Sequence, residues 1–169
     1  PALRPIRPAS MDTIRLFNAA RLTWKKPYQD GETVLDHKGT DIMLHGVAQF
    51  RKETTRRVEL RLVRKGRDIK ATEDLVRELG LVDIVTWLDE LSLMDFYREV
   101  ALSTAVFDQM ADSLPGMSTF DSLALGRPVI ANGRPDIPAL KNGVCQASTS
   151  SEISMWLHRI NDSNNYLED

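Results

Sequence analysis

The stretch VELRLVRKGRDIKATEDLVRELGLVDIVTWL, residues 58–88, contains the pattern that decides the fold. Residues 58–63 alternate apolar and polar side chains, as a strand does, and residues 84–88 form a second short apolar run. Between these runs Leu75, Val76 and Leu79 fall on one helical face, and Gly80 follows as a C-cap. A strand, a helix and a strand in this order predict a parallel crossover unit.

The same alternation extends in both directions from this unit. Three more strands are expected over residues 14–20, 104–107 and 128–131, and four more helices over residues 40–50, 93–100, 117–125 and 151–160. Ser92 is a candidate N-cap and Gly126 a helix stop. Strand followed by helix five times predicts an α/β fold, a doubly wound, Rossmann-like parallel sheet with helices on both faces. Ligands of such sheets bind at the carboxyl ends of the strands, so function is expected in loops 21–38, 64–68, 89–92, 108–116 and 132–138.

The composition narrows the classes of protein that remain. A chain of 169 residues is the size of one domain, and its net charge of −2 excludes a globally basic nucleic-acid binder. Its single cysteine, Cys145, excludes an internal disulfide and a zinc cluster built on thiolates. The sequence has no apolar run of membrane-spanning length and no signal-peptide core. We therefore expect a cytoplasmic domain with no nucleic-acid partner.

The first residues differ in character from the rest. Three prolines, Pro1, Pro5 and Pro8, fall within eight residues, a spacing typical of an interdomain linker. Residues 1–12 are interpreted as a linker or the remnant of an expression tag, and residues 13–169 as the folded domain.

The charges are distributed unevenly along the chain. Residues 51–70 carry nine bases and three acids, whereas residues 71–100 carry two bases and eight acids. One interpretation is a solvated surface with compensating neighbours. The other is an anion site near Arg64, Lys65 and Arg67.

Several familiar motifs are absent. No GxGxxG follows the first expected strand, which argues against an NAD-dependent oxidoreductase, and neither a GxxxxGK[ST] nor a GxSxG motif occurs. His37, His45 and His158 do not have metal-ligand spacing, and Cys145 has no evident activating base.

Two features suit a phosphate ligand. Arg21 follows the first strand, and Lys38-Gly39 opens the first helix. Two cations are therefore expected at the same edge of the sheet, where the strands end. The alternative is that both are ordinary exposed bases.

The second feature is SLPGMSTFDSLALGRPVI, residues 113–130. Gly116 lets the backbone approach a ligand closely, and the first helical turn after it offers free amides. Asp121, one turn further, suits a vicinal diol; alternatively Ser118 caps the helix and Asp121 only favours its dipole.

Taken together, these motifs resemble the C-terminal half of a group 1 glycosyltransferase of the GT-B fold. The resemblance covers residues 14–160 and rests on Arg21-Leu22, on Lys38-Gly39 and on the run DSLALGRPVI, residues 121–130. The segments LGLVDIV, residues 79–85, and VRKG, residues 63–66, match the entry to the family's third strand and its second-strand glycine turn.

The resemblance implies a site for a nucleotide-diphosphate sugar, with no metal and no other cofactor. Asp121 would hold the ribose diol, and Ser113, with Asp112 beside it, stands where the family has a glutamate that contacts the sugar. The diphosphate would be bound by Arg21, Lys38, Gly116, Met117 and Ser118, and the base by the segment Trp87, Leu88 and Asp89. An N-terminal acceptor domain, which this chain lacks, would complete the site, so the domain alone is expected to be inactive.

Two further interpretations stay open at this point. Ser113 in place of the glutamate favours a non-catalytic interaction or regulatory domain of the same fold. A nucleotide-sugar epimerase would use the same donor site but needs catalytic carboxylates, and the sequence offers no clear set of these. Membrane association of the parent protein has no support in the sequence.

Overall fold

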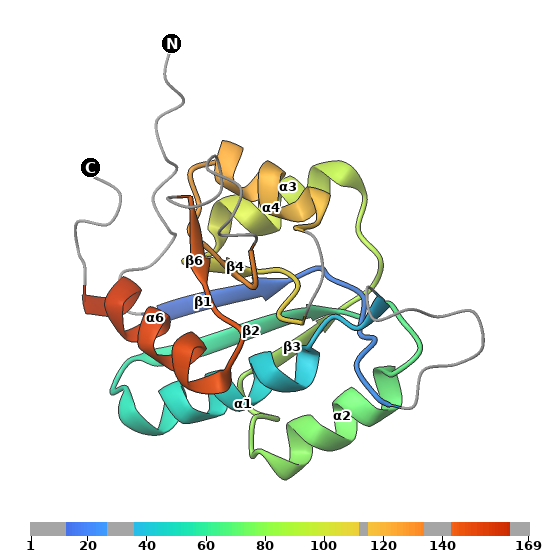
Figure 1. Ribbon diagram of the computed structural model, residues 1–169, viewed down its shortest axis with the longest axis vertical. Coiled ribbons are helices and arrows are strands. Elements are labelled where there is room, and N and C mark those ends of the chain that lie inside the picture. Colours follow the sequence, from blue (N-terminus) through green and yellow to red (C-terminus); the bar gives the residue numbers. More distant parts are fainter. Residues whose placement is uncertain (1–12, 27–35, 112–114, 134–142, 163–169) are drawn as a thin grey trace.

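The computed structural model describes residues 13–26, 36–111, 115–133 and 143–162, which form a single parallel sheet covered by helices on both faces (Figure 1). The predicted doubly wound α/β fold is therefore confirmed. The strands are β1 (Thr13–Asn18), β2 (Arg57–Val63), β3 (Val85–Leu88), β4 (Ala105–Phe107), β5 (Val129–Ala131) and β6 (Val144–Gln146). The helices are α1 (Thr40–Glu53), α2 (Ile69–Glu78), α3 (Leu93–Leu102), α4 (Met117–Ala124) and α6 (Ser150–Asp162).

The sheet has the strand order β3-β2-β1-β4-β5-β6, and every neighbouring pair is parallel. Five strands were expected, so the sixth, β6, is a correction. It is only three residues long, and three residues carry no measurable alternation of apolar and polar side chains. It closes the far edge of the sheet by pairing with β5.

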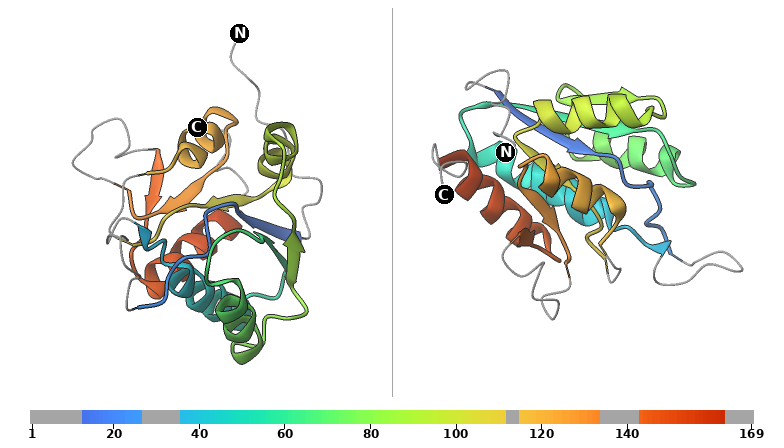
Figure 2. Two further views of the ribbon diagram at one scale, coloured as in Figure 1. Left: turned by 90° about the vertical axis from the view of Figure 1, so that its right-hand side faces the viewer. Right: turned by 90° about the horizontal axis from the view of Figure 1, so that it is seen from above.

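The helices lie in two layers, which are clear when the molecule is viewed along the strands (Figure 2, left). The larger core lies between the sheet and α1, α2 and α6, and includes Leu16, Leu60 and Phe107. The smaller one lies on the face that carries α3, and includes Phe17, Val63 and Val100. Leu16 and Phe17 are consecutive, so β1 sends alternate side chains to the two faces and both are buried.

The ends of the helices follow the expected signals. Ser92 accepts a hydrogen bond at Oγ from the Asp95 amide and so caps α3, as predicted. Gly80 and Gly126 follow α2 and α4 with positive φ, as the C-cap and the stop were predicted to do. Where α1 and α6 cross, Gly46 packs so closely that an added Cβ would lie 2.6 Å from Cβ of Ile153.

Candidate functional site

The strand order reverses between β1 and β4, and this reversal creates a crevice at the carboxyl ends of the two strands. The chain leaves β1 at Asn18 and β4 at Phe107, and these two residues are paired in register. The loops that follow therefore diverge from neighbouring points. Arg21, Lys38 and the amino end of α4, which are described next, lie on or near these two loops.

Backbone hydrogen bonds hold the loop after β1 in place. The buried Leu22 donates its amide to the Lys65 carbonyl at 2.6 Å, and its own carbonyl accepts from the Asp68 amide. The next carbonyl, that of Thr23, accepts from the Lys38 amide at 2.7 Å. Arg21 and Lys38 are 17 positions apart in sequence, but this bond draws their segments together at the crevice.

Lys38 joins the β1 side of the crevice to the β4 side. Its Nζ donates to Oε1 of Gln109 at 3.0 Å, and its carbonyl accepts from the Met110 amide at 2.9 Å. The next residue, Gly39, has a φ of 66° and lies against Met110, where an added Cβ would come within 2.8 Å of the methionine Cβ. Only glycine satisfies both the conformation and the space, which explains the Lys-Gly pair.

The electrostatic setting of Lys38 shows that a second cation is near. Burial lowers the pKa of Lys38 below its ordinary value, and the positive charge of Arg21 lowers it further, while Asp36 and Asp108 partly offset this. Arg21 itself is more than half exposed and lies 3.9 Å from Asp36 between Nη2 and Oδ1. Arg21 and Lys38 therefore lie close enough for their charges to interact, at the edge of the sheet where the strands end.

The amino end of α4 lies on the other side of Lys38. Gly116 is its N-cap, and an added Cβ there would lie 3.0 Å from Nε2 of Gln109, the same side chain that accepts from Lys38. The helix starts at Met117, directly after this N-cap, and has no side-chain cap, so Ser118 does not serve as one. Arg21, Lys38 and the Gly116 turn converge on one rim.

One expectation for this rim is corrected by the structure. The Gly116 amide does not point to open space, because it donates to Oδ2 of Asp108 at 2.8 Å. The same oxygen accepts from the hydroxyl of Thr119, and Asp108 is 4% exposed. The amides of Met117 and Ser118 have no acceptor within α4, since they belong to its first turn. They, rather than Gly116, can face an anion.

Asp108 and Gln109 were not singled out from the sequence, although the loop 108–116 was expected to be functional. The available signal was their position, since they are the first two polar residues after a buried strand that ends at the crevice. Their partners, Gly116 and Lys38, are 8 and 71 positions away in sequence, and no local pattern reveals such a pairing.

The remaining sequence-derived site residues fall into three groups. Asp121 is half-buried in α4, and its binding role stays a prediction. Ser113 and Asp112 lie outside the described residues. Trp87 and Leu88 belong to the edge strand β3, where the Trp87 ring packs under the Arg64 guanidinium at 5.1 Å and the Leu88 carbonyl accepts from the Arg64 amide.

The basic stretch near β2 has compensating neighbours, as the first interpretation of the charge pattern expected. Arg64 pairs with Glu73 at 2.9 Å, Lys65 with Glu90 at 2.8 Å, and Arg67 lies 3.4 Å from Asp68. Each base has an acid beside it, so a separate anion site at this stretch is not favoured.

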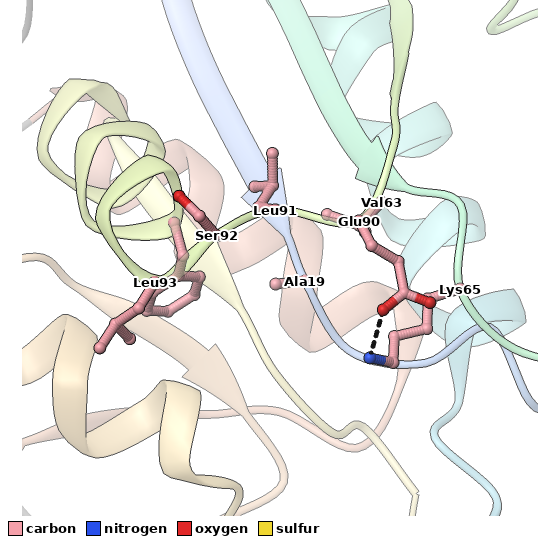
Figure 3. Close-up of a pocket in the computed structure, with 8 residues that line it drawn as sticks. Ala19, Val63, Lys65, Glu90, Leu91, Ser92 and Leu93 are labelled. Carbon is pink, nitrogen blue, oxygen red and sulfur yellow. Dashed lines mark hydrogen bonds and ion pairs between the residues drawn. The ribbon is translucent and has the colours of Figure 1, made fainter.

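A cavity of about 300 Å³ opens at the same edge of the sheet, between the ends of β1 and β2 and the start of α3 (Figure 3). Lys65 and Glu90 lie on one side of it and Ser92 and Leu93 on the other, with Ala19 between them. Trp87, Leu88 and Asp89 do not line it; the residues that directly follow them do. Its lining consists of Ala19, Val63, Lys65, Glu90, Leu91, Ser92, Leu93 and Phe96.

Within residues 13–26, 36–111, 115–133 and 143–162, no three side chains of His, Cys, Asp or Glu are grouped as metal ligands. In the same part of the chain, no helix combines the length and apolar character needed to cross a bilayer.

The sequence of the chain is similar to part of a known protein. No known family model matches the chain. Over 137 residues it is 32% identical to the MMP alpha-(1->4)-mannosyltransferase of Mycolicibacterium hassiacum, a match that covers 75% of this chain and 32% of that protein. The chain thus spans about a third of the length of this curated relative.

Several solved structures with a similar fold are glycosyltransferases. Anabaena Alr3699/HepE, solved with UDP and glucose, has a TM-score of 0.69 and 19% identity over 92% of this chain and 41% of its own. The lipopolysaccharide outer core galactosyltransferase WaaB, in its apo form, has a TM-score of 0.68 and 18% identity, covering 96% and 46%. TarM of S. aureus has a TM-score of 0.68 and 12% identity, covering 90% and 29%.

These similarities, together with the crevice, define the class of protein to which the chain is similar. The six-stranded parallel sheet is a Rossmann-like domain of the kind found in GT-B glycosyltransferases. The fold agrees with the resemblance to group 1 glycosyltransferases, and the sequence is similar to part of a mannosyltransferase.

Proposed function

We propose that this chain is the donor-binding half of a glycosyltransferase that transfers a sugar from a nucleotide-diphosphate sugar to an acceptor. The observation that carries the proposal is the convergence of Arg21, Lys38 and the amino end of α4 on one rim of the switch point. Two of the solved glycosyltransferases with this fold were crystallised with UDP, which supports a nucleoside diphosphate as the ligand.

In the proposed sugar transfer, negative charge develops on the diphosphate that leaves the sugar. As the bond between the sugar C1 and the diphosphate oxygen breaks, its electron pair moves onto that oxygen. A hydroxyl of the acceptor forms the new bond to C1, and its proton passes to the diphosphate oxygen that leaves. Arg21, Lys38 and the first-turn amides of Met117 and Ser118 can stabilise the leaving diphosphate, because a fixed positive field costs no reorganisation during the reaction.

Three finer features belong to the same proposal. Arg21 and Lys38 supply the positive charge that the leaving group needs, so we propose a reaction that requires no metal. Retention of configuration at C1 is carried over from the resemblance to the group 1 family. A reaction in the cytoplasm suits the composition, because a sequence with a single cysteine, Cys145, holds no internal disulfide.

The acceptor side of the reaction is assigned to a part of the protein outside this chain. The chain spans only about a third of the mannosyltransferase that it matches, and its crevice opens at one edge of a single sheet. We expect the chain alone to bind the donor weakly and to transfer no sugar. The alternative is a non-catalytic regulatory domain. It is tested with a longer protein that contains this chain and the acceptor half, because sugar transfer to any acceptor excludes a purely regulatory role.

The direct test is a titration of the chain with UDP, GDP and their sugars at millimolar concentration, followed by backbone amide shifts. We expect shifts at Arg21, Lys38, Gln109 and residues 117–121. If no nucleotide perturbs residues 117–121, the proposal is wrong.

Lys38→Ala is the matched variant for this test. Removing a charged donor from the diphosphate should weaken binding about tenfold or more. Lys52→Ala is the control, because Lys52 is an exposed base in the last turn of the same helix. An unchanged affinity in Lys38→Ala would remove Lys38 from the site.

A further inference from the structure

Segment 21–25, which brings Arg21 to the rim of the crevice, has no regular secondary structure of its own. Its backbone groups are therefore paired neither within a helix nor in a sheet ladder, and they need partners elsewhere. The loop after β2, residues 64–68, supplies them. The Leu22 amide donates to the Lys65 carbonyl at 2.6 Å, and the Leu22 carbonyl accepts from the Asp68 amide at 2.9 Å.

The side chain of Asp68 holds the end of the same segment. Its Oδ2 accepts from the Trp24 amide at 2.7 Å and from the Lys25 amide at 2.9 Å. Asp68 is only 9% exposed, and hydrogen bonds to a carboxylate that is largely removed from water are strong. Arg67 adds a further bond, because its Nη2 donates to the Lys25 carbonyl at 2.7 Å. One oxygen atom thus fixes two consecutive amides of the segment.

The indole ring of Trp24 is held by the same residue through Thr72. Nε1 of Trp24 donates to Oγ1 of Thr72 at 2.9 Å, and the Thr72 hydroxyl donates to the Asp68 carbonyl at 2.7 Å. Thr72 is fully buried in α2, so this partner is itself fixed by packing. Asp68 therefore supports both the backbone and the one large side chain of the segment.

Gly66 allows the two loops to lie this close. It has a φ of 123°, and an added Cβ would come within 2.6 Å of both the amide nitrogen and the carbonyl oxygen of Leu22. Only glycine satisfies both the conformation and the space. The loop after β2 is thus built to receive segment 21–25.

The position of Arg21 depends on this support. Its side chain is 56% exposed, and its ion pair with Asp36 is long, at 3.9 Å, so these contacts contribute little to its placement. The same segment also meets Lys38, because the Thr23 carbonyl accepts from the Lys38 amide. The backbone of segment 21–25 therefore decides whether Arg21 and Lys38 act on one anion.

We propose that Asp68 is a positioning residue for the diphosphate, which it does not touch: it fixes segment 21–25 so that Arg21 remains near Lys38. This inference rests on the proposed function, because it presumes that a diphosphate meets these two cations. It also gives the basic stretch after β2 a role other than anion binding.

Asp68→Asn and Asp68→Ala separate positioning from simple electrostatics. Asparagine keeps an acceptor oxygen for the two amides, whereas alanine has none. With GDP and UDP as probes, we expect Asp68→Asn to bind at least as tightly as the wild-type chain, since it has lost a negative charge near an anion. We expect Asp68→Ala to bind about tenfold more weakly, because Arg21 is no longer held. Electrostatics alone would raise the affinity of both variants.

The pKa of Lys38 gives a readout that a loss of stability alone would not move. Burial and the positive charge of Arg21 lower this pKa in the wild-type chain. Release of Arg21 in Asp68→Ala should therefore raise it, whereas removal of a nearby negative charge by itself would act in the opposite direction. Side-chain NMR of Lys38 in the free chain would measure the change, and an unchanged or lower pKa in Asp68→Ala would contradict the release of Arg21.

Asp74→Ala is the control, because it removes an exposed acid of α2 that pairs with Lys70. This variant should keep the wild-type affinity. If Asp68→Ala does not fold, Thr72→Val takes its place, since it removes only the support of the indole ring and should weaken binding several-fold. Unchanged or higher affinity in the folded Asp68→Ala, or in Thr72→Val where it replaces that variant, would overturn the positioning role and leave the diphosphate site intact. If the wild-type chain binds neither nucleotide at millimolar concentration, both the inference and the proposed function fail.

Discussion

Among single residues, Lys38 has the setting that most directly affects ligand binding. Its ammonium group is partly removed from water and lies near the positive Arg21, and both effects lower its pKa. The hydrogen bond to Gln109 keeps the side chain at the crevice despite this repulsion. A bound diphosphate would relieve the repulsion by placing negative charge between the two cations.

This setting predicts how binding depends on pH. A diphosphate binds the protonated form of Lys38, so affinity should fall as the pH rises through the pKa of that group. Because this pKa is lowered, the fall should begin at a lower pH than an ordinary lysine would give. The measurement is GDP affinity from neutral pH to about pH 10, the range in which lysines titrate.

Lys38→Arg serves as the comparison for this profile. Arginine stays protonated over the whole range, so the variant should lose little affinity on the alkaline side. Identical pH profiles for the wild-type chain and for Lys38→Arg would show that Lys38 does not titrate against the ligand.

At the level of elements, α4 is held at its amino end by a contact that reaches back to β4. The buried carboxylate of Asp108 accepts from the Gly116 amide and from the Thr119 hydroxyl. The helix has only eight residues, and its exposed Met117 and Phe120 contribute little packing there. The tether to Asp108 therefore decides where the first-turn amides point.

Thr119→Val tests this tether with little change of shape. The buried carboxylate would lose one of its two described donors, which should lower the free energy of unfolding by about 1–3 kcal/mol. GDP binding should weaken as well, since the amino end of α4 is no longer held. Chemical denaturation and calorimetry would measure the two effects.

Thr86→Val is the control for the loss of a hydroxyl group. Thr86 is half-buried on β3, and the described part of the chain shows no hydrogen bond from its side chain. This variant should change stability and binding little. Equal losses in the two variants would mean that the Asp108 contact has no special role.

At the scale of the whole molecule, one continuous sheet carries both cores. The three tryptophans, Trp24, Trp87 and Trp156, all pack against the larger core from separate segments. Since each of them reports on the same core, we expect chemical unfolding to be a single transition. Tryptophan fluorescence and far-UV circular dichroism should give the same midpoint, and two separated midpoints would contradict a single cooperative unit.

Most of this architecture was predictable from the sequence because long periodic segments carry a strong signal. The helix over residues 151–160 and the strand over residues 58–63 are examples, and both are present as α6 and β2. The convergence of Arg21 and Lys38 followed from the rule for parallel sheets. The strand β6 was missed because it is too short to show a period.

The hydrogen bonds within the site could not be predicted, because they depend on residues far apart in the sequence. Whether the Gly116 amide is free depends on Asp108, and the position of Nζ of Lys38 depends on Gln109. The cavity near α3 depends on the side chains of Lys65 and Glu90, which are 25 positions apart. Contacts of this kind arise from tertiary packing, and no local motif encodes them.

The reversal of strand order also divides the chain into two consecutive portions. Strands β1, β2 and β3 come from residues 13–88, and β4, β5 and β6 come from residues 105–146. The anion rim takes Arg21 and Lys38 from the first portion and Gln109 with α4 from the second. Two fragments separated at the exposed peptide Asp89-Glu90 would each carry half of the rim. Recovery of nucleotide binding on mixing would then make this domain a reporter of fragment complementation.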